Sequence, residues 1–186
     1  MDHDGAVPAA VLGRLLDRWA ESNLRAPLLI AATLAVLGLI LWAADRIGSK
    51  QLDLGAMTVP RALSIGVAQA AALVPGVSRS GATISLGLFE NFTREEIARF
   101  SFLMSTPIIF GAGLLKLPHM LRDMRHGDGS LTWTALLAGF VASAVVGTGV
   151  IRWMLDYLRR RTYAVFAWYR LALAAAVVVL WMSGKR

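Results

Sequence analysis

Apolar residues are grouped in long, nearly uninterrupted runs along this chain, unlike the short alternating patterns of a soluble domain. About 20 apolar residues cross the hydrocarbon core of a bilayer as a helix. Four runs reach that length, over residues 26–44, 98–117, 131–151 and 163–182. We therefore predict four membrane-spanning helices within a single membrane domain, preceded by a leader over residues 1–25.

The second run carries local signals for where its helix begins and bends. Thr93 followed by Glu96 forms a capping box, which predicts a helix start at about Arg94. Pro107 lies inside this run and is expected to kink the helix, and a polar loop is expected after Pro118. The third run holds small residues that let membrane helices approach closely, namely Gly139, Ala142, Ser143, Gly147 and Gly149.

Residues 58–90 do not have the pattern of a simple span. An apolar run over residues 62–74 stops at Pro75 and Gly76, and a second short run covers residues 82–89. Each run is too short to cross a bilayer, so together they predict two half-helices joined by a polar turn. Such a re-entrant hairpin is tolerated where its broken backbone is buried in protein or lines an aqueous cavity. The predicted fold class is thus an all-α polytopic membrane helix bundle with a re-entrant helix-loop-helix hairpin.

Composition supports a membrane location and narrows the ligands. The 186 residues are 56% hydrophobic and 17% charged, and the mean hydropathy is +0.58. The net charge of +7 favours anionic headgroups and phosphorylated ligands, because nucleic-acid binding requires a basic face on a soluble fold. Basic residues lie on both sides of the predicted spans, so charge alone does not orient them. The leader has no basic region or cleavage site typical of a signal peptide.

Polar chemistry is concentrated in the turn of the predicted hairpin. An arginine at membrane depth is costly unless it meets an anion, which makes Arg79 a functional candidate. A guanidinium can bind two phosphate oxygens, hydroxyls can donate further hydrogen bonds, and glycines let backbone amides approach. A half-helix beginning near Ala82 would add its positive dipole end. The candidate phosphate ligands are Gly76, Ser78, Arg79, Ser80, Gly81 and Thr83.

The alternative interpretation of this turn is an ordinary solvated loop. The apolar half-helices on both sides favour a site, because a surface loop does not need them. Gln69 on the first half-helix is a further candidate for the cavity, although polar residues in membrane helices often only join helices. Arg170 lies inside the last span and is the other candidate for the cavity, near the substrate, unless its long side chain reaches the interface.

These motifs resemble those of the undecaprenyl-diphosphate phosphatases of the bacitracin-resistance type. The resemblance covers roughly residues 26–182, and the string over residues 75–83 is highly specific to that family. The matching segments are TVPRALSIGVAQA over residues 58–70, PGVSRSGAT over residues 75–83, TREE over residues 93–96, RFSFL over residues 99–103, Pro107, and the pair Tyr169 and Arg170.

The resemblance implies an inner-membrane hydrolase that removes the terminal phosphate of undecaprenyl diphosphate and recycles the lipid carrier for cell-wall synthesis. It also implies bacitracin resistance, a site facing the periplasm, and a divalent cation, Mg²⁺ or Ca²⁺. By motif position, Arg79 would bind the diphosphate with Ser78, Ser80 and Thr83 as hydroxyl partners. Ser78 and Thr83 are each expected to act either as the nucleophile or as a hydrogen-bond donor.

One departure from the family pattern affects the expected activity. Family members contain two inverted repeats, and the first carries a glutamate-rich motif and a Ser-Ser-Ser-Gly-His string that this sequence lacks. The metal ligands are expected in that part and are unassigned in this chain. The expected partner is a polyprenyl diphosphate lipid, with a second copy or a complementing N-terminal half. The alternatives are a non-catalytic binder or flippase of the lipid phosphate, or an inactive fragment of the enzyme.

Overall fold

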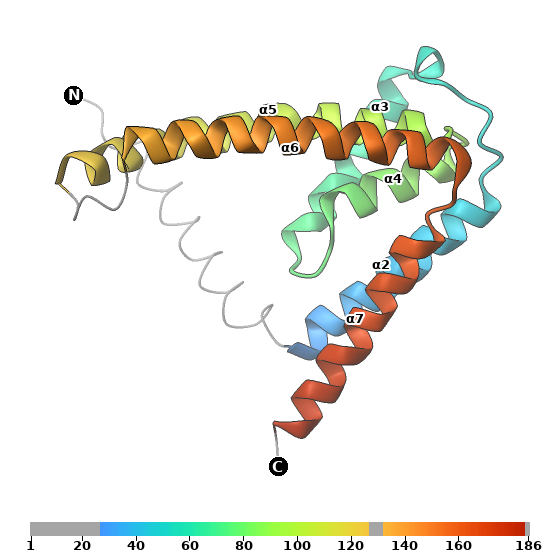
Figure 1. Cartoon of the computed structure of the whole chain (residues 1–186). Coiled ribbons are helices and arrows are strands. Elements are labelled where there is room, and N and C mark those ends of the chain that lie inside the picture. Colours follow the sequence, from blue (N-terminus) through green and yellow to red (C-terminus); the bar gives the residue numbers. More distant parts are fainter. Residues whose placement is uncertain (1–26, 127–131, 185–186) are drawn as a thin grey trace, which may run out of the picture.

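The computed structural model describes residues 27–126 and 132–184, and nearly all of them are helical (Figure 1). The predicted leader over residues 1–25 lies outside the described residues. Four helices are long and apolar enough to cross a membrane: α2 (Pro27–Ile47), α5 (Arg94–His126), α6 (Trp133–Arg160) and α7 (Ala164–Ser183). The predicted all-α fold with four candidate spans is therefore confirmed.

Two short helices form the predicted helix-loop-helix hairpin. Helix α3 (Val59–Ala70) continues into a 3-10 turn, η2 (Ala71–Leu73), and α4 (Arg79–Phe89) returns after the polar turn. A further 3-10 turn, η1 (Leu54–Ala56), lies in the connection from α2 to α3. Helix α4 begins at Arg79 rather than near Ala82, because Ser78 caps it and brings the arginine into its first turn.

The long helices form two pairs that diverge from one end of the molecule (Figure 1). Helices α5 and α6 lie side by side in one pair, and α2 packs along α7 in the other. Helix α4 contacts α2, α3 and α5, so the hairpin joins the two pairs. The fold thereby places the turn before α4 against α2 and α7.

The boundaries of two long helices differ from those predicted. Helix α5 continues through Pro107 and Pro118 to His126, so the polar loop predicted after Pro118 is wrong. Helix α6 extends beyond residue 151 to Arg160. Hydropathy marks the part of a helix that suits the bilayer core, whereas backbone hydrogen bonding continues into polar sequence that still favours helix.

Helix α5 starts where the sequence predicted, but its capping box is only half formed. The amide of Glu96 donates to Thr93 Oγ1 at 3.3 Å, which satisfies one of the free amides of the first turn. The amide of Thr93 donates instead to the carbonyl oxygen of Leu52 at 2.9 Å. Tertiary contact with the connection from α2 to α3 therefore replaces the second half of the box.

The buried core lies at the end where the two helix pairs meet. Its central residues come from all the long helices or their ends and from the hairpin: Leu41, Ala44, Ile65, Ile84, Leu88, Phe92, Ile97, Ala98, Leu158 and Tyr163. Gly87 allows this contact, because a Cβ atom there would collide with the side chain of Ile97. Close packing of α4 against α5 thus depends on glycine at this position.

A network of polar contacts around Asp45 links the helices at the same end of the molecule. Asp45, at the end of α2, is only 4% exposed and forms an ion pair with Arg94 of α5. The backbone amide of Tyr163 donates to the second carboxylate oxygen of Asp45 at 3.1 Å. The Tyr163 hydroxyl donates to the carbonyl oxygen of Arg94 at 3.2 Å. These bonds hold α2, α5 and the start of α7 together.

Candidate functional site

The turn of the hairpin requires glycine at its first bend. Gly76 has a φ of +86°, a conformation that residues with a Cβ atom rarely adopt. A Cβ atom there would also collide with Thr33 Oγ1 and approach the backbone of Ile30. The Thr33 hydroxyl bonds the carbonyl oxygen of Pro75 at 2.9 Å, so the turn is fastened directly to α2.

The residues after this bend cap α4. The amide of Gly81 donates to Ser78 Oγ at 3.2 Å, and the hydroxyls of Ser78 and Ser80 are 3.2 Å apart. Ser78 is therefore the N-cap residue of α4, and two hydroxyls stand at the positive end of this helix. Helix N-termini with nearby donors favour anions.

Arg170 of α7 approaches the same turn from the opposite side. Its Nη2 donates to the carbonyl oxygen of Gly76 at 3.1 Å, while its Nε is buried and has no hydrogen-bond partner among the described residues. A Cβ atom at Gly81 would lie 3.5 Å from Arg170 Nη1. A partly buried guanidinium, whose Nε is enclosed, is thus held beside the N-terminus of α4, where an anion would compensate its charge.

These groups line a pocket of about 200 Å³, which we term the hairpin pocket. It is lined by Leu41, Ser78, Ser80, Gly81, Ile84, Phe166, Tyr169 and Arg170. The polar members are two hydroxyls, a phenol and a guanidinium, and the others are apolar. The pocket therefore combines donors suited to phosphate oxygens with an apolar wall suited to a hydrocarbon chain.

The structure brings only some of the predicted site residues to this pocket. Ser78, Ser80, Gly81 and Arg170 line it, and Gly76 shapes the turn beside it. Arg79 is exposed in the first turn of α4 and does not line the pocket. Its predicted grip on the diphosphate stays a prediction.

Thr83 and Gln69 lie away from the hairpin pocket. Thr83 is 0% exposed, and its hydroxyl shares a hydrogen bond of 2.7 Å with Ser101 of α5. It also lies 3.1 Å from the carbonyl oxygens of Arg79 and Ser80. Gln69 Oε1 is buried without a hydrogen-bond partner among the described residues, and Gln69 does not line the pocket.

Sequence reasoning missed several residues that build this site. Thr33 is a single hydroxyl inside an apolar run, where threonine is common enough to carry no signal by itself. Tyr169 lines the pocket beside Arg170; the sequence marked it only as part of the pair that matches the family, without a role in the site. Ser101 lies in the matched segment RFSFL, but nothing local in the sequence indicates its pairing with Thr83.

A divalent cation does not fit the hairpin pocket as the described residues build it. None of its lining residues is a carboxylate, and carboxylate and carbonyl oxygens are the usual ligands of Mg²⁺ and Ca²⁺. Across residues 27–126 and 132–184, no group of three or more His, Cys, Asp or Glu side chains is placed to hold a metal. The arginine in the pocket would also repel a cation.

Comparison with known proteins gives this geometry a family context. The family model described as Bacitracin resistance protein BacA matches residues 4–176. The chain is 46% identical over 178 residues to an undecaprenyl-diphosphatase of Moorella thermoacetica, which covers 95% of this chain and 66% of that protein. It is 47% identical over 174 residues to an undecaprenyl-diphosphatase of Rubrobacter xylanophilus, with 94% and 63% covered.

A third relative shows the same pattern of coverage. An undecaprenyl-diphosphatase of Anaeromyxobacter dehalogenans is 48% identical over 181 residues, which covers 97% of this chain and 60% of that protein. The chain thus spans 60% to 66% of the length of these relatives. The residues that the family model matches, 4–176, include the whole hairpin.

Proposed function

Because this chain belongs to the BacA family of bacitracin resistance proteins, we propose that it hydrolyses undecaprenyl diphosphate to undecaprenyl phosphate and inorganic phosphate. The relatives described above are named undecaprenyl-diphosphatases. This reaction would recycle the lipid carrier used in cell-wall synthesis and lower sensitivity to bacitracin. The chain is a multi-pass membrane protein, and we propose the bacterial inner membrane as its location, with the hairpin pocket open to the periplasm.

The hairpin pocket is the single observation that carries this proposal. Ser78 and Ser80 place two hydroxyls at the N-terminus of α4, and beside them Arg170 presents a buried Nε that has no partner among the described residues. The terminal phosphate of the diphosphate would accept hydrogen bonds from these groups, which are already in place before binding. Preorganised donors stabilise the charge that grows on phosphoryl oxygens in the transition state.

The apolar part of the pocket supports a lipid substrate. Leu41 of α2, Ile84 of α4 and Phe166 of α7 line the pocket together with the polar groups. All three belong to the hairpin or to the helix pair that packs against it, so a prenyl chain would lie along them while its diphosphate meets the turn. A soluble phosphate ester would leave this wall uncovered.

Arg79 is suited to the second phosphate group. It is the first residue of α4 and is exposed next to the turn, where a helix dipole and an exposed guanidinium both favour an anion. We propose that Arg170 and the two serines bind one phosphate and that Arg79 binds the other. In the reaction, water would form a bond to the terminal phosphorus while the bond between that phosphorus and the bridging oxygen breaks. The bridging oxygen would leave on undecaprenyl phosphate, and the proton of the water would pass to solvent.

We propose that a divalent cation is needed for hydrolysis only when a second copy or a complementing segment completes the enzyme. The residues of the hairpin pocket do not provide its ligands, so no step is assigned to it. Its ligands would come from a second copy or a complementing segment. Thr83 would support the pocket indirectly, because its hydrogen bond to Ser101 holds α4 against α5.

A second candidate function is binding or flipping of the lipid phosphate without hydrolysis. The observation that favours it is the lining of the hairpin pocket: the described residues that form it include no carboxylate and no histidine to accept a proton from water. Hydroxyls, a phenol and an arginine suffice to bind a phosphate. A hairpin site between diverging helices is also an architecture found in transporters.

Phosphate release from undecaprenyl diphosphate by the purified chain in detergent with Mg²⁺ tests the proposal. We expect release that is lost in Arg79→Ala and kept in Arg122→Ala, a control that removes an exposed arginine at the far end of α5. Saturable binding without release would instead support the binder. The proposal is wrong if the chain neither binds nor hydrolyses the lipid.

A further inference from the structure

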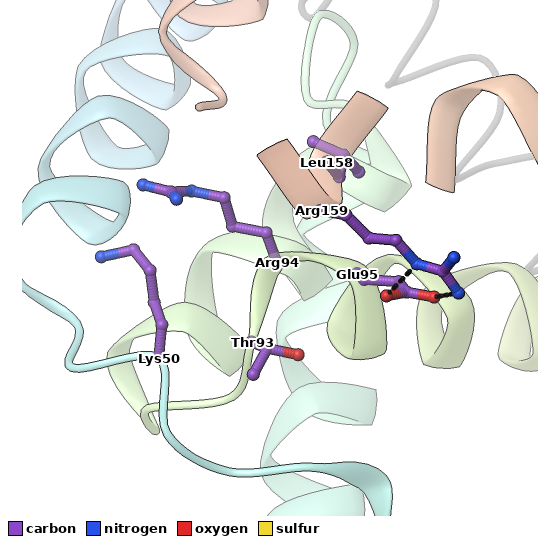
Figure 2. Close-up of a pocket in the computed structure, with 6 residues that line it drawn as sticks. All are labelled: Lys50, Thr93, Arg94, Glu95, Leu158 and Arg159. Atoms are coloured by element: carbon purple, nitrogen blue, oxygen red, sulfur yellow. Dashed lines mark hydrogen bonds and ion pairs between the residues drawn. The ribbon is translucent and has the colours of Figure 1, made fainter. Parts of the chain in front are cut away.

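A second pocket, of about 320 Å³, lies where the helix ends converge and shares no lining residue with the hairpin pocket. It is lined by Lys50, Thr93, Arg94, Glu95, Leu158 and Arg159, and we term it the cationic pocket. Figure 2 shows the side chains of Lys50 and Arg94 extending to the same side, while Arg159 turns onto Glu95. Three basic residues from three separate segments therefore contribute to the lining of one pocket.

The backbone around Lys50 is fastened to the segment that starts α5. The amide of Ser49 donates to Asn91 Oδ1 at 2.8 Å, and the amides of Gln51 and Leu52 both donate to the Asn91 carbonyl oxygen, at 2.9 and 3.0 Å. Bonds on both sides of Lys50 thus fix its position relative to Arg94. The pocket is formed before any ligand arrives, which lowers the entropic cost of binding.

The carboxylates near the pocket compensate only part of its positive charge. Asp45 pairs with Nε of Arg94, so the two terminal amino groups of that guanidinium remain on the side shared with Lys50 (Figure 2). Glu95 accepts from Nε and Nη2 of Arg159, each at 2.7 Å. The bond recorded for the Lys50 ammonium among the described residues is to the carbonyl oxygen of Gly48, at 2.6 Å. Among the described residues, no carboxylate is recorded as a partner of this ammonium, which lies on the same side as the Arg94 guanidinium (Figure 2).

The pocket lies at the ends of the long helices, which indicates a position near the membrane surface. Helices α2 and α6 end beside it, at Ile47 and Arg160, and α5 and α7 begin there. Aromatic rings accompany these ends: Arg46 lies 5.5 Å from the Trp42 ring, and the rings of Trp153 and Tyr157 are 5.8 Å apart. Such aromatic residues are typical of the headgroup region of a bilayer.

We propose that the cationic pocket binds the phosphate group of an anionic lipid headgroup. The Lys50 ammonium and the terminal amino groups of Arg94 donate to the phosphate oxygens, and Asp45 keeps the guanidinium in place. The N-terminal dipole of α5 adds to the attraction. At the level of the helix ends, a lipid headgroup is the phosphate source with the highest local concentration, and the volume suits a glycerol phosphate.

Lipid retention measured by native mass spectrometry tests this site in the intact chain. The protein is released from vesicles of phosphatidylcholine with or without phosphatidylglycerol, and the lipids that stay bound are identified. The affinity for each lipid is then measured by titrating the purified protein with that lipid. We expect preferential retention of phosphatidylglycerol, weakened about fivefold by Lys50→Gln and preserved by Lys50→Arg. The control Arg122→Gln removes the same charge at the far end of α5 and should change the affinity by less than about twofold.

A third arm of the experiment separates the two sources of phosphate. Inorganic phosphate should displace phosphatidylglycerol from the wild type, whereas chloride at equal ionic strength should not, if the phosphate group is what the pocket recognises. Binding of inorganic phosphate without preference for phosphatidylglycerol would overturn the assignment to a lipid. Equal weakening in Lys50→Gln and Arg122→Gln would overturn the site itself, because only general surface charge would then act. An unchanged melting temperature in Lys50→Gln shows that a weaker affinity is not caused by unfolding.

Discussion

Arg170 donates from Nη2 to the carbonyl oxygen of Gly76 at 3.1 Å, so the last long helix holds the turn of a hairpin that is distant in sequence. Thr33 of α2 holds the neighbouring carbonyl oxygen of Pro75 at 2.9 Å. The two hydrogen bonds attach the turn to α7 and to α2, which pack along each other.

Replacing Arg170 with lysine should weaken binding of a lipid diphosphate by about tenfold or more. The planar guanidinium can donate to the Gly76 carbonyl oxygen from one nitrogen and to a phosphate from the others, whereas a lysine ammonium has only one nitrogen. The affinity is measured by titrating the purified chain with undecaprenyl diphosphate. Arg152→Lys is the matched control, since Arg152 is exposed on α6 and outside both pockets. Equal affinities in Arg170→Lys and the wild type would contradict the role given to Arg170.

Replacing Gly76 with alanine should destabilise the protein by about 2–4 kcal/mol. The residue has a φ of +86°, which costs a residue with a Cβ atom about 1–2 kcal/mol, and the added methyl group would collide with Thr33 Oγ1. Thermal unfolding in detergent measures the change. Gly139→Ala provides the comparison, because a Cβ atom at Gly139 in α6 meets nothing within 4 Å, so that variant should unfold at or above the wild-type temperature.

Replacing Asp45 with asparagine should lower the free energy of unfolding by about 3 kcal/mol, since it leaves Arg94 without its carboxylate. The partly exposed guanidinium will recover some hydration, which keeps the loss at the lower end for a broken buried pair. Asp156→Asn is the control: Asp156 is 72% exposed in its pair with Arg159, and such surface pairs contribute about 0–1 kcal/mol. Similar melting temperatures in the two variants would show that the pair of Asp45 with Arg94 contributes no more than a surface pair.

Replacing Thr83 with valine should reduce stability by about 1–2 kcal/mol, because it leaves the buried Ser101 hydroxyl without its 2.7 Å partner. Ser101→Ala should cause a loss of similar size. The double variant should lose less than the sum of the two, since both changes remove the same bond. Additive losses would show that Thr83 and Ser101 act separately, and normal stability with lost phosphate release would favour a direct catalytic role for Thr83.

The long helices could be predicted because their apolar runs exceed what a soluble core of this size can bury. Their ends could not be predicted in the same way. Helix α5 continues to His126 and α6 to Arg160, because hydrogen bonding within a helix does not require apolar side chains. Hydropathy therefore locates the bilayer-matched part of each helix and misses the polar extensions.

The candidate site was predicted where local chemistry was unusual. Ser78, Ser80 and Gly81 stand out as polar and small residues between two apolar half-helices, and Arg170 stands out as a charge inside a span. Thr33 and Asp45 do not stand out, since their roles depend on partners in distant segments: the Pro75 carbonyl oxygen for Thr33, and Arg94 and Tyr163 for Asp45.

Sequence by itself determined that the chain is a helical membrane protein with a polar turn suited to phosphate, because bilayer insertion and the cost of a charge at membrane depth act on each segment separately. Tertiary structure decided which hydrogen-bonding and charged groups lie next to one another. It placed Arg170 against Gly76, turned Thr83 onto Ser101, and brought Lys50 beside Arg94. These pairings follow from how helices pack and how loops are fastened, and such contacts between distant segments leave no local pattern in the sequence.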